Sequence, residues 1–134
     1  MARVLLVDDD DLVRRTLAGM LEAAGHAVVS AAGGREALAI LGDQAFDLVI
    51  TDIFMPGADG METIRGIRAM SKSIPVIAMS GGPRAAPTMQ SLAAIDHMEI
   101  AQMLGATKAL QKPIRKADLI AAVDECLTGD ATAG

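Results

Sequence analysis

Aromatic residues are nearly missing from this sequence, which has no Trp, no Tyr and only two Phe, Phe46 and Phe54. Surfaces that stack nucleobases or flavin rings depend on aromatic side chains, so a binding surface of that kind is not expected. Because 51% of the 134 residues are hydrophobic, the core must instead be aliphatic, with Val, Ile, Leu, Ala and the nine Met as its building blocks.

Cysteine and basic charge are also scarce. The single cysteine, Cys126, excludes a disulfide within the chain and fits a reducing compartment. The formal net charge is −5, which argues against nonspecific nucleic-acid binding. No apolar run approaches the roughly 18 residues of a membrane span, and the apolar stretch 4–7 is too short for a signal peptide. We therefore expect a cytoplasmic protein that contacts neither nucleic acid nor membrane.

Short apolar runs alternate with helical patterns along the chain. The runs predict five strands, at Val4–Val7, Ala27–Ala31, Leu48–Thr51, Val76–Met79 and Lys108–Gln111. The first, third and fourth are nearly continuous in apolar residues, which is typical of strands covered on both faces. The second and fifth runs are weaker and are expected at the edges of the sheet.

Helical spacing of apolar residues predicts four helices, at Leu12–Ala24, Arg35–Leu41, Met61–Met70 and Lys116–Leu127. Gly25 and Gly42 are expected to end the first two. A further helix is expected at residues 97–104, with Asp96 as its N-cap and Gly105 after its last turn. Strands alternating with helices predict parallel βαβ units, so the fold class is α/β with a doubly wound, five-stranded parallel sheet. We expect one domain over residues 1–128 and a flexible tail over 129–134.

Four consecutive acidic residues, 8–11, follow the first predicted strand. Ligands of doubly wound sheets bind at the carboxyl ends of the strands. One of Asp10 and Asp11 is explained as the N-cap of the next helix. That interpretation leaves Asp8 and Asp9, whose carboxylates would repel each other unless a cation lay between them. We interpret this pair as metal ligands.

Three more polar residues, Asp52, Ser80 and Lys112, stand at the ends of later predicted strands. A carboxylate such as that of Asp52 can form an aspartyl-phosphate. A serine hydroxyl and a lysine ammonium can both hold phosphoryl oxygens. Each residue alone has a plain interpretation, as a turn residue or a solvated lysine. As a set, a nucleophile, metal ligands and charge-stabilising donors predict phosphoryl transfer.

Four segments resemble the response-regulator receiver domains of two-component signalling: VLLVDD (4–9), DLVITDIFMPG (47–57), PVIAMS (75–80) and LQKP (110–113). The resemblance covers nearly the whole chain and implies a CheY-like, or flavodoxin-like, strand order 2-1-3-4-5. It implies that Asp52 is the phosphorylation site and that Ser80 and Lys112 hold the phosphoryl oxygens. It also implies a Mg²⁺ site, able to take Mn²⁺, formed by Asp9, Asp52 and the carbonyl of Phe54, with Asp8 acting through water. The Lys112–Pro113 peptide is expected to be cis.

The resemblance implies a role as well. The chain would take a phosphoryl group from a sensor histidine kinase or a histidine phosphotransfer protein and signal by contact with a downstream protein. It would be a phosphoacceptor rather than an enzyme. Two alternatives stay open: a receiver excised from a longer regulator or histidine kinase, and an unphosphorylated scaffold. A dehalogenase-type phosphatase would need a late second acidic motif, and a flavodoxin-like FMN carrier would need a phosphate loop where the acids stand.

Two features depart from the family pattern. Ala109 stands where the family usually has a Tyr or Phe whose ring moves on phosphorylation, so the usual readout is in doubt. The stretch between Ser80 and Lys112 is longer than is usual, and we expect residues 81–95 to form an added lobe that serves the partner. Phe54 is expected to border the water that attacks the phosphate.

Overall fold

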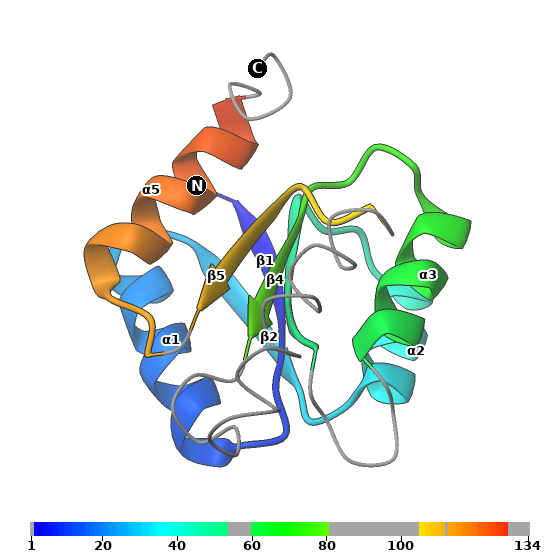
Figure 1. Cartoon of the computed structure of the whole chain (residues 1–134), viewed down its shortest axis with the longest axis horizontal. Coiled ribbons are helices and arrows are strands. Elements are labelled where there is room, and N and C mark those ends of the chain that lie inside the picture. Colours follow the sequence, from blue (N-terminus) through cyan, green and yellow to red (C-terminus); the bar gives the residue numbers. More distant parts are fainter. Residues whose placement is uncertain (1, 54–59, 81–104, 112, 129–134) are drawn as a thin grey trace, which may run out of the picture.

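The computed structural model describes residues 2–53, 60–80, 105–111 and 113–128 (Figure 1). Within them, five strands form one parallel sheet of order β2-β1-β3-β4-β5. The strands are β1 (Arg3–Val7), β2 (Ala27–Ala31), β3 (Leu48–Asp52), β4 (Val76–Ser80) and β5 (Lys108–Gln111). The predicted doubly wound sheet is therefore confirmed, including its strand order and the edge positions of β2 and β5.

Helices cover both faces of this sheet. In Figure 1, α1 (Asp11–Ala23) and α5 (Lys116–Thr128) lie on one face, while α2 (Gly34–Asp43) and α3 (Gly60–Met70) lie on the other. The predicted bounds agree with these to within two residues. Across the described parts of the chain, no helix has the length and apolar character needed to cross a membrane.

The core is aliphatic and divided by the sheet into two clusters. Successive side chains of a strand point to opposite faces, so β1 contributes Leu5 and Val7 to the cluster beneath α2 and α3. Its residues Val4 and Leu6 join the other cluster, beneath α1 and α5. All four are fully buried, which explains why this strand is apolar without alternation.

The two ends of α1 follow the sequence signals. Asp10 is the N-cap, and its Oδ1 accepts hydrogen bonds from the amides of Leu12 at 2.9 Å and Val13 at 3.2 Å. The chain leaves α1 through Gly25, whose φ of 95° lies in the left-handed region that favours glycine. One acid of the quartet 8–11 is thus explained by helix capping alone.

The predicted end of α2 at Gly42 is wrong. The helix continues to Asp43, and the amide of Gln44 still donates to the carbonyl of Ile40 at 2.9 Å. Glycine is tolerated in a last helical turn, and Gly42 is not among the glycines with positive φ. A glycine in the sequence therefore marked the end of one helix and not of the other.

Arg68 connects two segments that lie far apart in the sequence. Its Nε and Nη2 donate to the carbonyl oxygen of Gly105 at 2.8 and 2.6 Å. Its Nη1 donates to the carbonyl oxygens of Ile74 at 2.5 Å and Ser71 at 3.3 Å. The guanidinium thus ties the α3–β4 connection to the point where the chain enters β5.

Cys126 lies in the core on α5, with 5% of its surface exposed, and burial raises the pKa of its thiol. Because the thiolate is the nucleophile, we expect iodoacetamide at pH 8 to alkylate the folded protein at least about tenfold more slowly than the urea-unfolded chain. The unfolded chain also ionises first as the pH rises, so this thiol should make the fold less stable above about pH 8.5. Intact mass after iodoacetamide labelling measures the alkylation rates of the folded and unfolded chain, with Cys126→Ser as the unlabelled control. Equal rates in the two states would contradict it.

Candidate metal and phosphoryl site

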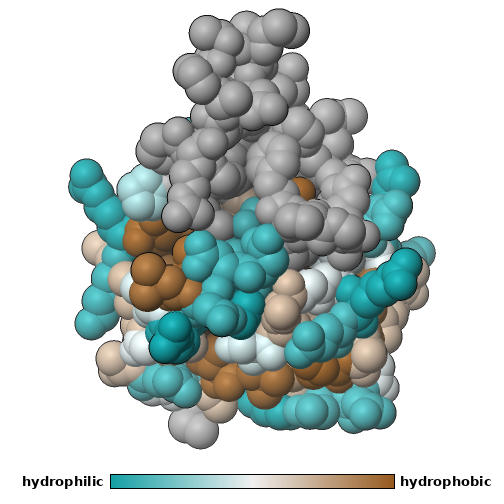
Figure 2. All heavy atoms as spheres, turned by 90° about the horizontal axis from the view of Figure 1, so that it is seen from below, coloured by the Kyte–Doolittle hydropathy of each residue, from teal (hydrophilic) through white to brown (hydrophobic). Residues whose placement is uncertain are grey.

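Two neighbouring strands end side by side at the lower edge of the sheet in Figure 1. β1 and β3 are paired in parallel, with Val7 level with Thr51. The residues that follow these two, Asp8 and Asp52, are therefore brought to the same edge. Figure 2 views the molecule from this edge, where hydrophilic and hydrophobic side chains lie next to one another.

Asp8, Asp9 and Asp52 converge here. One carboxylate oxygen of each lies within 4.8 Å of the others. Asp8 is fully buried and Asp52 is 3% exposed, while Asp9 is exposed. Three carboxylates at this spacing repel one another, and a set of oxygen donors is what Mg²⁺ prefers. The donor set therefore fits a hard divalent cation, with Asp9 on the solvent side.

Backbone hydrogen bonds hold both buried acids in place. The amide of Asp8 donates to the carbonyl of Ala31 in β2 at 3.2 Å. The Oδ1 of Asp8 accepts a hydrogen bond from the amide of Asp10 at 2.9 Å, which orients that carboxylate. Asp52 is the last residue of β3 and lies level with Met79 of β4, whose carbonyl accepts from the amide of Ile53 at 3.0 Å. The main chain therefore fixes the positions of Asp8 and Asp52 at this edge of the sheet.

Of the other predicted site residues, the structure describes only the backbone of Ser80. Ser80 ends β4, level with Gln111 of β5, so its backbone lies at the same edge of the sheet. The side chain of Ser80 lies outside the described residues, as do Phe54, Lys112 and the peptide to Pro113. The expected lobe at 81–95, the helix at 97–104 and the tail at 129–134 also lie outside them. Ala109, where a ring is usual in the family, pairs with Ala78 in the sheet.

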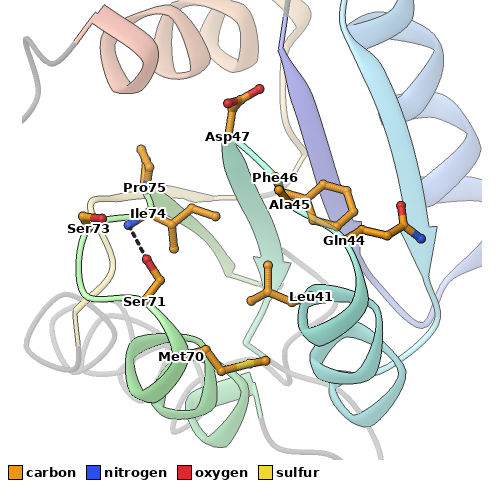
Figure 3. A pocket seen from close by; sticks show the side chains of 10 residues that line it. All are labelled: Leu41, Gln44, Ala45, Phe46, Asp47, Met70, Ser71, Ser73, Ile74 and Pro75. Atoms are coloured by element: carbon orange, nitrogen blue, oxygen red, sulfur yellow. Dashed lines mark hydrogen bonds between the residues drawn. The ribbon is translucent and has the colours of Figure 1, made fainter.

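A hollow lies at the opposite edge of the sheet from these acids, between the ends of α2 and α3 (Figure 3). Leu41, Phe46 and Met70 are among its lining residues. Its one carboxylate, that of Asp47, accepts a hydrogen bond from the amide of Arg3 at 2.8 Å. The described residues that line this hollow lack the convergent acids of the other edge, so the hollow does not suit phosphoryl chemistry.

Removing Asp9 should weaken Mg²⁺ binding at least about tenfold, because the affinity of such sites follows the number of charged ligands. It should also stabilise the metal-free fold by on the order of 1 kcal/mol, since crowded carboxylates repel. Calorimetric Mg²⁺ titration and urea unfolding of Asp9→Ala test the two effects. Asp124→Ala is the matched control, because Asp124 is an exposed acid on α5. Equal Mg²⁺ affinity in wild type and Asp9→Ala would contradict the assignment.

Known proteins share this arrangement of elements. Residues 4–124 match the family model of the response regulator receiver domain. Response regulator protein FleR of Pseudomonas aeruginosa is 34% identical over 119 residues, which make up 89% of this chain and 23% of FleR. The curated relatives are longer proteins, of which the chain spans between 23% and 47%.

Solved structures of response regulators are also similar to this chain. A response regulator receiver domain protein from Clostridium thermocellum matches with a TM-score of 0.84 at 26% identity, and each chain is covered in full. The chemotaxis protein CheY4 of Vibrio cholerae matches with a TM-score of 0.81 at 32% identity, over 95% of this chain and 99% of CheY4.

Proposed function

This chain belongs to the response regulator receiver domain family, and from that premise we propose that it accepts a phosphoryl group on Asp52 in a Mg²⁺-dependent reaction. The observation that carries the proposal is the convergence of three carboxylates, from Asp8, Asp9 and Asp52, at one edge of the sheet. Asp8 and Asp9 would supply most of the negative charge that holds the cation, and Asp52 would be both a metal ligand and the acceptor.

The reaction would be a simple displacement. A carboxylate oxygen of Asp52 attacks the phosphorus atom of the donor, and the bond from phosphorus to the leaving group breaks. The leaving group, a histidine nitrogen or a carboxylate, keeps the electron pair of that bond. Asp52 becomes an acyl phosphate. A bound Mg²⁺ would offset the charge of the phosphoryl oxygens, and Asp8, Asp9 and Asp52 would hold it there.

We assign the remaining roles by family resemblance. Ser80 and Lys112 would bind phosphoryl oxygens, and the carbonyl of Phe54 would complete the metal ligands. The phosphoryl donor would be a sensor histidine kinase or a histidine phosphotransfer protein in the cytoplasm, and the output would be contact with another protein. The domain would assist its own phosphorylation without acting as an enzyme on other substrates. The same chemistry would apply if the chain is one part of a longer regulator, as its relatives are.

Incubation with acetyl phosphate tests the proposal without a partner kinase. With Mg²⁺ present, intact mass should show the gain of one phosphoryl group per chain, and EDTA should prevent it. Hydroxylamine should remove the group, since acyl phosphates react with it and phosphoesters do not. An unchanged mass with both acetyl phosphate and phosphoramidate as donors would contradict the proposal and favour an unphosphorylated scaffold.

A further inference from the structure

Arg14, in the first turn of α1, folds back over the connection that carries the proposed metal ligands. Its Nη1 donates to the carbonyl oxygen of Asp8 at 2.6 Å. That carbonyl belongs to the peptide that joins Asp8 to Asp9. We propose that Arg14 is a positioning residue of the metal site: it holds this peptide plane and thereby sets the direction of both carboxylates. The inference rests on the proposed function.

The surroundings of Arg14 favour this role. Its side chain is 17% exposed, whereas that of Asp11, with which its Nη2 forms an ion pair, is 74% exposed. Exposed ion pairs add little to stability. The bond to the Asp8 carbonyl is the more shielded of the two, and a hydrogen bond from a charged donor is a strong one. The ion pair with Asp11 then serves mainly to keep the guanidinium turned towards the connection.

The direction of the Asp9 side chain depends most on the hydrogen bond from Arg14 to the Asp8 carbonyl. Asp8 has two further contacts, because its amide donates to the carbonyl of Ala31 and its Oδ1 accepts from the amide of Asp10. Asp10 is held as the N-cap of α1. The side chain of Asp9 is exposed, and within the described residues no hydrogen bond fixes it. Its direction therefore follows from the peptide before it, which is the one that Arg14 holds.

Two possible effects of Arg14 on a bound cation have opposite signs. Arg14 is positively charged, so if it acted through charge alone, its removal would strengthen Mg²⁺ binding. If it acts by positioning, its removal weakens binding, as the loss of residues that orient metal ligands generally does. The sign of the change in affinity therefore separates the two.

The test compares Arg14→Ala with Arg15→Ala by calorimetric Mg²⁺ titration of the metal-free protein. Arg15 is the exposed neighbour on the same helix, so both variants lose one charge at nearly the same place. We expect Arg14→Ala to bind Mg²⁺ about tenfold more weakly than wild type. Arg15→Ala should bind as wild type does or slightly more tightly. Binding by Arg14→Ala that equals or exceeds that of Arg15→Ala would overturn the inference.

A second measurement works without metal. In the metal-free protein, the hydrogen exchange rate of the Asp10 amide reports on its hydrogen bond to the Asp8 carboxylate. This exchange should become faster in Arg14→Ala. Arg14→Lys keeps the charge but loses the planar fork of the guanidinium. Its Mg²⁺ affinity and its exchange rate at Asp10 should lie between those of wild type and Arg14→Ala. This variant replaces Arg14→Ala in both measurements if Arg14→Ala does not fold. Unchanged exchange at Asp10 would overturn the inference. A wild type that binds no Mg²⁺ would instead count against the proposed function, whatever the exchange shows.

Discussion

Asp52→Asn is expected to take up no phosphoryl group from acetyl phosphate, where the wild type takes up one. The uncharged amide is a far weaker nucleophile than a carboxylate, and no other described carboxylate lies at the end of β3. The substitution also removes one of three crowded negative charges. The metal-free variant should therefore be more stable than wild type, by on the order of 1 kcal/mol.

Intact mass after incubation with acetyl phosphate and Mg²⁺ measures the first effect, and urea unfolding measures the second. Asp124→Asn is the matched control, because it makes the same chemical change at an exposed position of α5. That control should label as wild type does. Undiminished labelling of Asp52→Asn would falsify the assignment of the acceptor, even if the protein proved to be phosphorylated elsewhere.

Arg68→Ala is expected to lower the free energy of unfolding by about 3 kcal/mol, because hydrogen bonds from a charged group are worth about 1.5–3 kcal/mol each and are not additive. The guanidinium donates to the carbonyls of Gly105, Ile74 and Ser71. The guanidinium is half-buried, and this burial lowers its pKa. Truncation would leave these carbonyls without their donor and would loosen the entry into β5, the strand that leads to Lys112.

Urea unfolding measures this loss, and Arg65→Ala is the control, since Arg65 is exposed on the same helix. The control should change the stability by less than about 0.5 kcal/mol. Arg68→Lys should recover only part of the loss, because one ammonium cannot reproduce the planar fork that reaches two segments. Equal destabilisation by Arg65→Ala and Arg68→Ala would show that the hydrogen bonds contribute nothing measurable.

The acids of the site illustrate how far a linear pattern can go. Asp8 and Asp52 follow apolar runs, and the carboxyl ends of parallel strands share one edge, so their convergence could be predicted before any coordinates. The same pattern could not say which acid of the quartet 8–11 caps the helix, and the backbone geometry selects Asp10. It also could not show that Asp8 is fully buried while Asp9 is exposed.

The sheet and the location of the acidic site could be predicted from the sequence, because burial on two faces and helical spacing leave regular patterns in it. The strand order came from the resemblance to the receiver family. The contacts of Arg14 and Arg68 could not be predicted in this way. Arg14 and Arg15 are adjacent and identical, and only packing against the β1–α1 connection turns one inward and leaves the other in solvent. Arg68 and Gly105 are 37 residues apart. A hydrogen bond between residues so distant depends on how α3 and β5 lie in space, and it leaves no local pattern in the chain.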